Sequence, residues 1–322
     1  MPEPAAPATG VPPGPLAFGG APLGNMFAEL SEEDAFAALE DAWAAGIRYF
    51  DTAPHYGVGL SERRMGAFLR TKPRDEFMLS TKVGRLLVPD PGADGRDDEG
   101  FDVPATTKRR WAFGADDVRR SLDESLERLG LDRVDILYIH DPERSDTGLD
   151  AALATAIPAV AALRDEGVVG RVGIGTMVNE AVVTAVRTGA LDLAMIANRL
   201  TLADHSALEA AVPACREHGV GVVAAAPFNS GLLAHSEPRG HFDYQDVPSE
   251  VLDRVRRIAA ICREHGVELP TAALHYPLRF GAETVVVGAR RAGQMAENRR
   301  RLETPVPEEL WSALAARGLI AA

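Results

Sequence analysis

Cysteine and basic charge are both scarce in this 322-residue sequence. Its two cysteines, Cys215 and Cys262, are too few for a disulfide framework and lack metal-ligand spacing. We expect both to be small buried side chains in a reducing compartment. Acidic residues outnumber basic ones by 47 to 34, which gives a formal net charge of −13. Because a nucleic-acid surface needs a basic stripe, this charge argues against nucleic acid as a partner.

Long apolar runs are also missing. No run approaches the roughly 20 apolar residues that a membrane-spanning helix needs. The first 15 residues, MPEPAAPATGVPPGP, contain neither the basic nor the apolar region of a signal peptide. We therefore expect a flexible leader over 1–15, followed by a single domain over 16–322. These absences predict a cytoplasmic protein that does not bind membranes.

What the sequence does contain is a regular alternation of strand-like runs and amphipathic helices. Ser31 suits an N-cap, Gly130 suits the end of a helix, and Pro158 and Pro213 predict kinks or late helix starts. An open dinucleotide-binding sheet would need G-x-G-x-x-G, and GIGTMV at 173–178 lacks the third glycine. Eight units instead predict an α/β fold, the (β/α)₈ TIM barrel. The predicted strands are 16–20, 47–51, 76–82, 134–140, 168–175, 193–197, 221–227 and 283–288.

Two stretches are too long to be plain connections in a barrel. Residues 83–115 and 228–248 show no clear periodicity, and loops of this length are usually functional or disordered. Both follow strand ends, on the face where barrel enzymes build their active sites. They are interpreted as walls or lids of a substrate pocket. Additional helices are expected at 269–280 and 307–319.

Three of the predicted strands end in ionisable residues. Asp51, Lys82 and His140 close successive strands, and Tyr56 lies five residues after Asp51 in a loop flanked by glycine. Each alone has an ordinary explanation: a turn cap, a lysine reaching water, a structural histidine or a loop anchor. In a barrel, however, consecutive strand ends share one rim. The four side chains are therefore predicted to form one catalytic cluster.

The residues around this cluster resemble the aldo-keto reductase family over nearly the whole chain. The resemblance implies a catalytic tetrad of Asp51, Tyr56, Lys82 and His140, with Lys82 favouring the Tyr56 phenolate and His140 orienting the substrate oxygen. It also implies hydride exchange with a nicotinamide cofactor. The motifs that carry it are GIRYFDTAPHYGVGLSERRMGAFL (46–69), STKVG (80–84), RSLDESLERLGLDRVDILYIHDP (120–142) and VVVGARRAGQMAENRR (285–300).

The resemblance also implies where NAD or NADP binds. The usual Ser-Asn after the fifth strand is here Gly175-Thr176, and Asn198 stands near the usual glutamine. Gln294 occupies the place of a basic residue common in NADP-preferring members, so the balance leans slightly to NAD. The phosphates are expected on the FNSG loop and at the start of a helix. The implied cofactor contacts are Gly20, Asp51, Gly175, Thr176, Asn198, Phe228, Asn229, Ser230, Gly231, Gly288, Ala289, Arg290, Gln294, Glu297 and Asn298.

The FNSG loop, the HDP after the fourth strand and the long insertion resemble the family branch of L-fucose, D-threo-aldose, L-galactose and pyridoxal dehydrogenases. This implies oxidation of an aldose at C1 to a lactone by a monomer or small homo-oligomer. Tyr56 and His140 would hold the substrate hydroxyl. Trp111, Arg110 and His235 are possible sugar contacts, although Trp111 could equally pack the insertion. The alternatives are an NADPH-dependent reductase of aldehydes or ketones, and a nucleotide-sensing protein with little turnover.

Overall fold

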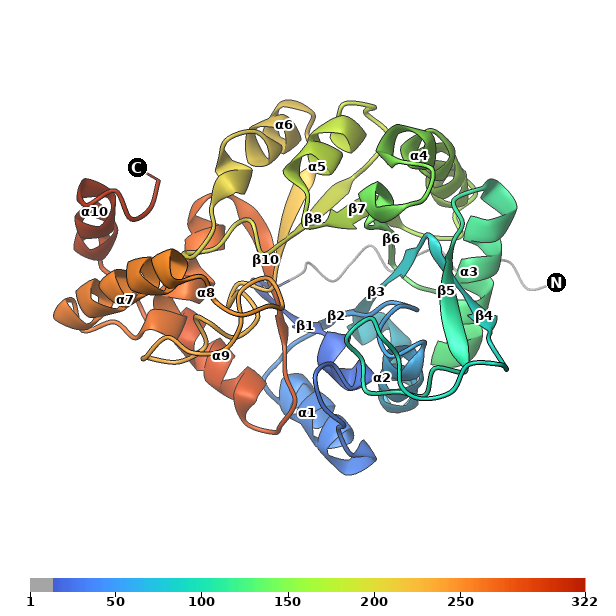
Figure 1. Ribbon diagram of the computed structural model, residues 1–322, viewed down its shortest axis with the longest axis horizontal. Coiled ribbons are helices and arrows are strands. Elements are labelled where there is room, and N and C mark those ends of the chain that lie inside the picture. The colour runs from blue at the N-terminus through green and yellow to red at the C-terminus, as the bar shows by residue number, and fades with distance from the viewer. Residues whose placement is uncertain (1–13, 322) are drawn as a thin grey trace.

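The computed structural model describes residues 14–321 and has a closed barrel of eight parallel strands at its centre (Figure 1). Around the barrel the strands follow the order β1-β10-β9-β8-β7-β6-β3-β2. The predicted TIM barrel is confirmed, and each strand overlaps its expected range. The barrel strands are β1 Leu16–Gly19, β2 Tyr49–Asp51, β3 Met78–Val83, β6 Ile136–His140, β7 Arg171–Thr176, β8 Leu193–Ala197, β9 Gly221–Ala225 and β10 Ala282–Gly288.

Helices surround the strands, with α7, α8 and α10 gathered on one side (Figure 1). Ser31 caps α1 by accepting a hydrogen bond from the Asp34 backbone N–H at 3.0 Å, and Gly130 ends α3 with φ 63°. Pro213 stands in the first turn of α6, whereas α4 continues through Pro158. The helices are α1 Glu32–Ala44, α2 Leu60–Leu69, α3 Ala115–Leu129, α4 Leu149–Asp165, α5 Asn179–Val186, α6 Ala211–Glu217, α7 Ser249–Glu264, α8 Leu269–Arg279, α9 Gln294–Glu303 and α10 Glu308–Ala316.

The barrel interior is filled by side chains and leaves no channel through the sheet. Its cluster includes Met78, Leu193 and Val286, and it also holds two tyrosines. The hydroxyl groups of Tyr49 and Tyr138 lie 3.1 Å apart, which satisfies both in a buried position. Because the interior is packed, chemistry on a ligand is restricted to the mouth of the barrel, at the carboxyl ends of the strands.

The chain enters the barrel against its last strand. Residues 1–13 of the expected leader lie outside the described residues. The carbonyl of Gly14 accepts a hydrogen bond from the Thr284 hydroxyl at 3.0 Å. The carbonyl of Pro15 accepts one from the Val285 backbone N–H at 3.0 Å. These two residues are therefore held to β10 just before β1 begins.

The first insertion contains a regular element that its sequence pattern does not reveal. Strands β4 Arg85–Pro89 and β5 Thr107–Trp111 form an antiparallel hairpin in which Arg85 pairs with Trp111. Figure 1 shows the hairpin outside the barrel, near α3. In β5, exposed and half-buried residues alternate, and Lys108 and Arg110 point to solvent. The expectation of an irregular loop was wrong here because basic residues occupy both faces of β5, which hides the period of two.

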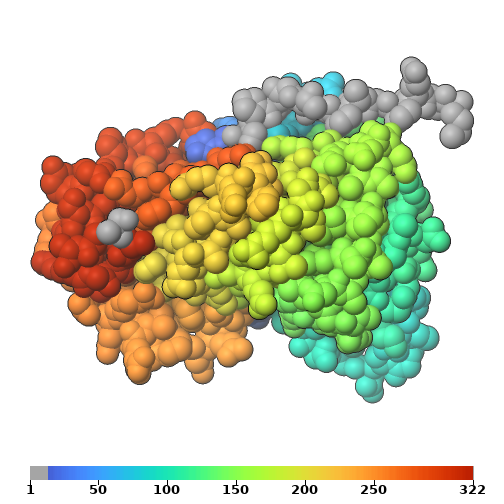
Figure 2. Space-filling view, turned by 90° about the horizontal axis from the view of Figure 1, so that it is seen from above, coloured from blue at the N-terminus to red at the C-terminus, as the bar shows by residue number. Residues whose placement is uncertain are grey.

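The second insertion, residues 228–248, has neither a helix nor a strand of the barrel. Its tip meets the β1–α1 loop, where the Phe27 ring stacks on His241 with centroids 5.4 Å apart and lies 6.1 Å from Tyr244. The Phe27 backbone N–H also donates to the Gly100 carbonyl of the first insertion at 3.1 Å. The orange and cyan segments that contain the insertions project from the same end of the barrel (Figure 2). Both insertions therefore wall its mouth.

Candidate active site

Asp51 and Lys82 form a buried ion pair at the ends of β2 and β3. The Lys82 Nζ lies 2.6 Å from Asp51 Oδ2 and 2.8 Å from Oδ1, and it also donates to the Thr52 carbonyl at 3.0 Å. The Ser80 hydroxyl donates to Asp51 Oδ1 at 2.6 Å. Both charged side chains are almost fully buried, so each charge depends on the other for compensation. As predicted, the carboxyl ends of β2 and β3 lie side by side.

Tyr56 and His140 complete the cluster. The Lys82 Nζ lies 4.9 Å from the centre of the Tyr56 ring. The Tyr56 and His140 rings meet edge to face with centroids 5.8 Å apart. The structure therefore brings together all four residues that the sequence placed on one rim.

The Tyr56 loop is fixed by a close approach of two glycines. A Cβ on Gly57 would lie 2.3 Å from the Gly24 carbonyl oxygen, and a Cβ on Gly24 would lie 2.5 Å from the Tyr56 carbonyl carbon. Gly57 also has φ 60°, in the left-handed region. Backbone packing between the loops after β1 and β2 thus sets the position of Tyr56.

Burial, more than Lys82, governs the protonation of Tyr56. The pKa of Tyr56 is raised well above its usual value, chiefly because the phenol is buried, and further by the negative charges of Asp51 and Asp141. This differs from the expectation that Lys82 favours the phenolate. The reason is that Asp51 neutralises the ammonium at 2.6 Å. The phenol carries its proton and is a hydrogen-bond donor.

His140 has the opposite shift. Its pKa is lowered well below the usual value because the ring is buried and because Arg85 and Lys82 are nearby cations. The imidazole is therefore neutral near pH 7 and keeps one N–H for a substrate oxygen. Two different donors, a phenol and an imidazole, thus face each other at the barrel mouth.

Several residues at this site were not identified from the sequence. Arg85, at the start of β4, is buried, and its guanidinium lies 3.2 Å from a ring nitrogen of His55 and 3.2 Å from Glu99. Its guanidinium also donates to Asp141, the residue after His140. Phe101 of the first insertion lies 6.1 Å from the Tyr56 ring. The one feature of the sequence that could have identified them is position, since Arg85 and Asp141 closely follow the predicted strand ends at Lys82 and His140.

The expected sugar contacts differ in their surroundings. The Arg85 guanidinium lies 4.5 Å from the Trp111 ring centre, and Phe113 stacks on Trp111 at 6.1 Å. Trp111 therefore packs the hairpin, which was its alternative explanation. Arg110 is half exposed and pairs with Asp117, and His235 contacts Arg239 near the surface. Within residues 14–321, no hydrogen bond or ion pair joins these three side chains to the tetrad.

Asn198, at the end of β8, provides an observation that fits a nicotinamide cofactor. Its side chain is fully buried, and neither amide atom makes a hydrogen bond of ordinary length and angle within the described residues. The nearest candidate is the Tyr244 hydroxyl, which lies close enough for the amide to offset part of the rise in the pKa of that phenol. Buried amide atoms normally find partners, and a carboxamide offers one acceptor and one donor. Thr176, by contrast, is engaged, because it donates to Glu143 at 2.8 Å and accepts from the Val178 N–H at 2.9 Å. Gly175 leaves space beside the Lys82 side chain, with a Cβ position 3.7 Å from its Cε.

The predicted phosphate loop is held in an unusual backbone conformation. Ala226, Asn229 and Ser230 all have positive φ. The Asn229 amide donates to the Asn198 carbonyl at 3.1 Å, and the Ser230 hydroxyl accepts from the Tyr244 N–H at 3.0 Å. Of the other expected contacts in this region, Phe228 is half-buried on the core and Gly231 bridges to His241. The loop's own side chains therefore stabilise it, as a rigid phosphate cradle requires.

Glycines bring the backbone of three strands close together on the same rim. A Cβ on Gly20 would lie 2.7 Å from the Asp51 carbonyl oxygen, and a Cβ on Gly288 would lie 2.7 Å from the Pro22 side chain. Ala289, next to Gly288, is almost fully buried. These predicted positions lie on the rim with the tetrad, at the ends of β1 and β10.

The start of α9 is less open to anions than the sequence suggested. The Arg290 guanidinium donates to the carbonyls of Met26, Ala28 and Glu29 at 2.7 to 3.0 Å. The Gln294 side chain accepts from the N–H groups of Arg290 and Arg291. Asp41 already accepts from the Met295 N–H at 2.9 Å. Glu297 pairs with Arg300 and Arg301, and the Asn298 amide oxygen accepts from Arg301 at 3.3 Å.

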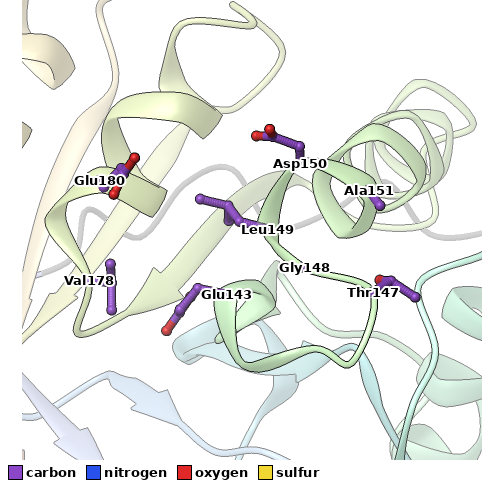
Figure 3. Close-up of a pocket in the computed structure, with 8 residues that line it drawn as sticks. All are labelled: Glu143, Thr147, Gly148, Leu149, Asp150, Ala151, Val178 and Glu180. Carbon is purple, nitrogen blue, oxygen red and sulfur yellow. The ribbon is translucent and has the colours of Figure 1, made fainter.

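A separate depression of about 490 Å³ lies between the connections β6–α4 and β7–α5 (Figure 3). Figure 3 shows Glu143 and Val178 across from Leu149 and Asp150 around it. None of the tetrad residues lines it, so it is distinct from the cluster at the barrel mouth. Elsewhere in residues 14–321, no helix is both long enough and apolar enough to cross a bilayer.

Comparison with known proteins gives this arrangement a family. The profile of the Aldo/keto reductase family matches residues 15–317. The chain is 52% identical to D-threo-aldose 1-dehydrogenase from a Pseudomonas species, covering 99% of this chain and 98% of that protein. It is 35% identical to pyridoxal 4-dehydrogenase from Microbacterium luteolum, with coverage of 97% and 96%.

Solved structures agree with the sequence comparisons. The holo form of an aldo-keto reductase from Bacillus halodurans has a TM-score of 0.73 at 25% identity, covering 96% of this chain and 93% of that one. A glycerol dehydrogenase from Gluconobacter oxydans has a TM-score of 0.75 at 20% identity, covering 97% and 93%, which supports the fold alone. Family members use NAD(P)H. This chain therefore belongs to the aldo/keto reductase family of oxidoreductases.

Proposed function

We propose that this protein oxidises an aldose at its anomeric carbon to the lactone, using NAD(P)⁺ and preferably NAD⁺. The observation that carries this substrate class is the 52% identity, over nearly both full chains, to D-threo-aldose 1-dehydrogenase. The clustered Asp51, Tyr56, Lys82 and His140 support the chemistry, because they supply a proton acceptor and an oxygen-orienting donor at one place. These four are proposed as the catalytic residues.

When bound, NAD(P)⁺ supplies a hydride acceptor for the hydrogen and electron pair that leave the anomeric carbon. The hydroxyl on that carbon gives its proton to Tyr56 in its phenolate form, and the C–O bond becomes the lactone carbonyl. His140, as a neutral donor, holds the same oxygen in place. The Lys82 ammonium lies 4.9 Å from the Tyr56 ring, but the Asp51 carboxylate at 2.6 Å offsets its attraction for a phenolate, in keeping with the raised pKa of Tyr56.

Residues from several parts of the rim are proposed to hold the cofactor. The buried amide of Asn198 is proposed to bind the nicotinamide carboxamide. Gly20, Gly175 and Gly288 are proposed to border the cofactor, and close packing against Asp51 and Pro22 requires glycine at the first and last of them. The loop Phe228–Gly231 is proposed to hold the pyrophosphate through its backbone N–H groups. Thr176 and Ala289 would border the cofactor without donating to it.

The preference for NAD⁺ is supported by the charges around the start of α9. The Arg290 guanidinium donates hydrogen bonds to three backbone carbonyls, and the Asp41 carboxylate accepts from the first N–H groups of α9. A 2′-phosphate near this point would meet the Asp41 carboxylate and an Arg290 guanidinium that is already engaged, with the exposed Arg291 as the neighbouring cation. Gln294, Glu297 and Asn298 add no positive charge. NADP⁺ is therefore expected to bind more weakly.

The test follows absorbance of reduced nicotinamide over a panel of aldoses and pyridoxal, each with NAD⁺ and with NADP⁺. We expect turnover with aldoses that share the stereochemistry of L-fucose or D-threo-aldoses, and a higher kcat/KM with NAD⁺. Turnover of aldehydes or ketones with NADPH alone would favour a reductase. The protonated Tyr56 phenol favours that second function, since reduction consumes this proton. Firm cofactor binding without turnover of any substrate would point to a regulatory protein.

A further inference from the structure

Arg85, the first residue of β4 in the hairpin insertion, is the largest fully buried side chain of the described residues. One terminal nitrogen of its guanidinium lies 3.2 Å from a ring nitrogen of His55 and 3.2 Å from Glu99. The other donates to the Asp141 carboxylate. Trp111 covers the guanidinium at 4.5 Å from its ring centre. A buried guanidinium with this many contacts is held in one orientation.

The partners of Arg85 are the immediate neighbours of the two proton-handling residues. Asp141 follows His140 in the chain, and its Oδ2 lies 3.7 Å from the His140 Nε2. His55 precedes Tyr56, and its ring meets the His140 ring edge to face at 5.5 Å. Arg85 therefore reaches both sides of the His140 imidazole through residues that Arg85 itself fixes.

A second arginine of the hairpin completes this support. Arg109 donates to the His55 backbone carbonyl at 2.9 Å and pairs with Asp97. His55 is thus held at its ring by Arg85 and at its carbonyl by Arg109. The insertion reaches this loop at further points, since the Phe101 ring lies 5.1 Å from the His55 ring and Glu99 lies 3.8 Å from His55 Nδ1. Several contacts therefore hold the insertion against the Tyr56 loop.

We propose that Arg85 is a positioning residue: from the hairpin insertion it clamps Asp141 and His55 on either side of His140, and so fixes the imidazole that holds the substrate oxygen. This inference rests on the proposed function of His140. It assigns the insertion a role in catalysis that the tetrad alone does not contain. Without these contacts to Arg85, the Asp141 carboxylate is free to turn toward His140 and accept a hydrogen bond from its ring N–H.

The charges around His140 come from several elements. Arg85 from β4, Lys82 from β3, Arg144 from the turn after β6 and His55 all lower its pKa, in addition to burial. Asp141 is the acidic group in contact with it. Tyr56 faces it as a neutral phenol. Loss of Arg85 would remove a nearby cation and leave Asp141 unpaired, and both changes favour a protonated imidazole.

The experiment compares the Arg85→Met, Arg85→Gln and Arg85→Lys variants with the native protein. Lys108→Met is the control, since Lys108 lies on the same hairpin but faces solvent and pairs with Asp90. Three readouts are collected: NMR titration of the His140 ring, assigned with His140→Gln; kcat and KM for the best aldose; and the Kd of NAD⁺ from fluorescence.

In Arg85→Met and Arg85→Gln, the pKa of His140 is expected to rise toward the ordinary histidine value of about 6.5. We expect kcat to fall by about tenfold or more, while the Kd of NAD⁺ stays within about twofold. In Arg85→Lys, His140 should still titrate at a pH below its usual value, because the positive charge is kept. This variant should recover only part of kcat, because an ammonium lacks the paired N–H donors of the guanidinium. Lys108→Met should match the native protein in all three readouts.

Unchanged His140 titration and kcat in a folded Arg85→Met or Arg85→Gln protein would overturn the proposal. An increase in KM with kcat intact would also overturn it, because Arg85 would then be a substrate contact. If no Arg85 variant folds while Lys108→Met does, Arg85 is purely structural and the proposal fails. If the native protein oxidises no aldose, the proposed function fails, but the NMR comparison still decides the clamp.

Discussion

The Lys82 ammonium lies 2.6 Å from the Asp51 carboxylate at the floor of the barrel mouth, and both side chains are almost fully buried. Neither charge has water to compensate it, so each is stable only through the other. The same pairing limits what Lys82 can do to Tyr56. The pKa of the phenol is raised by its burial, and the ammonium does not reverse this.

This pair leads to a prediction about stability. Asp51→Asn leaves a buried ammonium without its counter-charge, so the free energy of unfolding is expected to fall by about 3–5 kcal/mol. Lys82→Met should cost a similar amount. The double variant Asp51→Asn/Lys82→Met should recover part of the loss, since no isolated charge remains. Urea denaturation of the four proteins measures this, and additive losses in the double variant would contradict it.

The proposed proton-transfer role of Tyr56 predicts that removing its hydroxyl lowers kcat without changing the Kd of the cofactor. Tyr56→Phe removes the hydroxyl and keeps the ring, so kcat should fall by about 10²–10⁴-fold. The Kd of the cofactor should stay nearly unchanged. Steady-state kinetics and fluorescence titration measure the two quantities. A Phe variant with near-native turnover would refute the assignment.

The raised pKa of Tyr56 predicts the direction of the pH dependence. Oxidation needs the phenolate as proton acceptor, and a raised pKa keeps the phenol protonated at neutral pH. The kcat for oxidation should therefore rise with pH and should not level off below about pH 10. Reduction needs the protonated phenol and should decline only in the same alkaline range. A kcat profile for oxidation that peaks near pH 7 would show that another group accepts the proton.

Asn198 provides a test of the cofactor site. Asn198→Gly removes the buried amide but tolerates the observed φ of 60°. Losing the carboxamide contacts should weaken cofactor binding by about 1–3 kcal/mol, or roughly 5- to 150-fold in Kd. Stability of the cofactor-free protein should change by no more than about 1 kcal/mol, because the amide makes no hydrogen bond of ordinary length and angle within the described residues. Isothermal titration and thermal unfolding separate the two effects; an unchanged Kd would exclude the proposed contact.

The glycine contact behind Tyr56 predicts an effect at a distance from the reacting atoms. In Gly24→Ala, the new Cβ would lie 2.5 Å from the Tyr56 carbonyl carbon, so the backbone must shift. We expect kcat to fall by about tenfold or more with a stability loss of about 1–3 kcal/mol. Gly92→Ala is the control, since nothing lies within 4 Å of its Cβ position. Equal kcat in the two variants would mean that Tyr56 tolerates the displacement.

The barrel and its tetrad could be predicted because their signals are local. Each strand is a short apolar run, and an ionisable residue directly after Phe50, Thr81 or Ile139 marks a strand end. Barrel closure then places neighbouring strand ends on one rim. The hairpin was missed because its strands carry arginines on both faces, which gives no period of two. Its burial depends on ion pairs with distant residues such as Asp97 and Asp141.

The sequence by itself determined the fold class, the eight strands and the order of the four tetrad residues around the rim, since short-range patterns and chain order decide these features. Only the tertiary structure decided the protonation of Tyr56 and His140, the engagement of Arg290 and Thr176, and the clamp around Arg85. The physical reason is that desolvation, charge compensation and the supply of hydrogen-bond partners depend on which side chains meet in space. Those neighbours are often more than 30 residues away along the chain, as Arg85 is from Asp141.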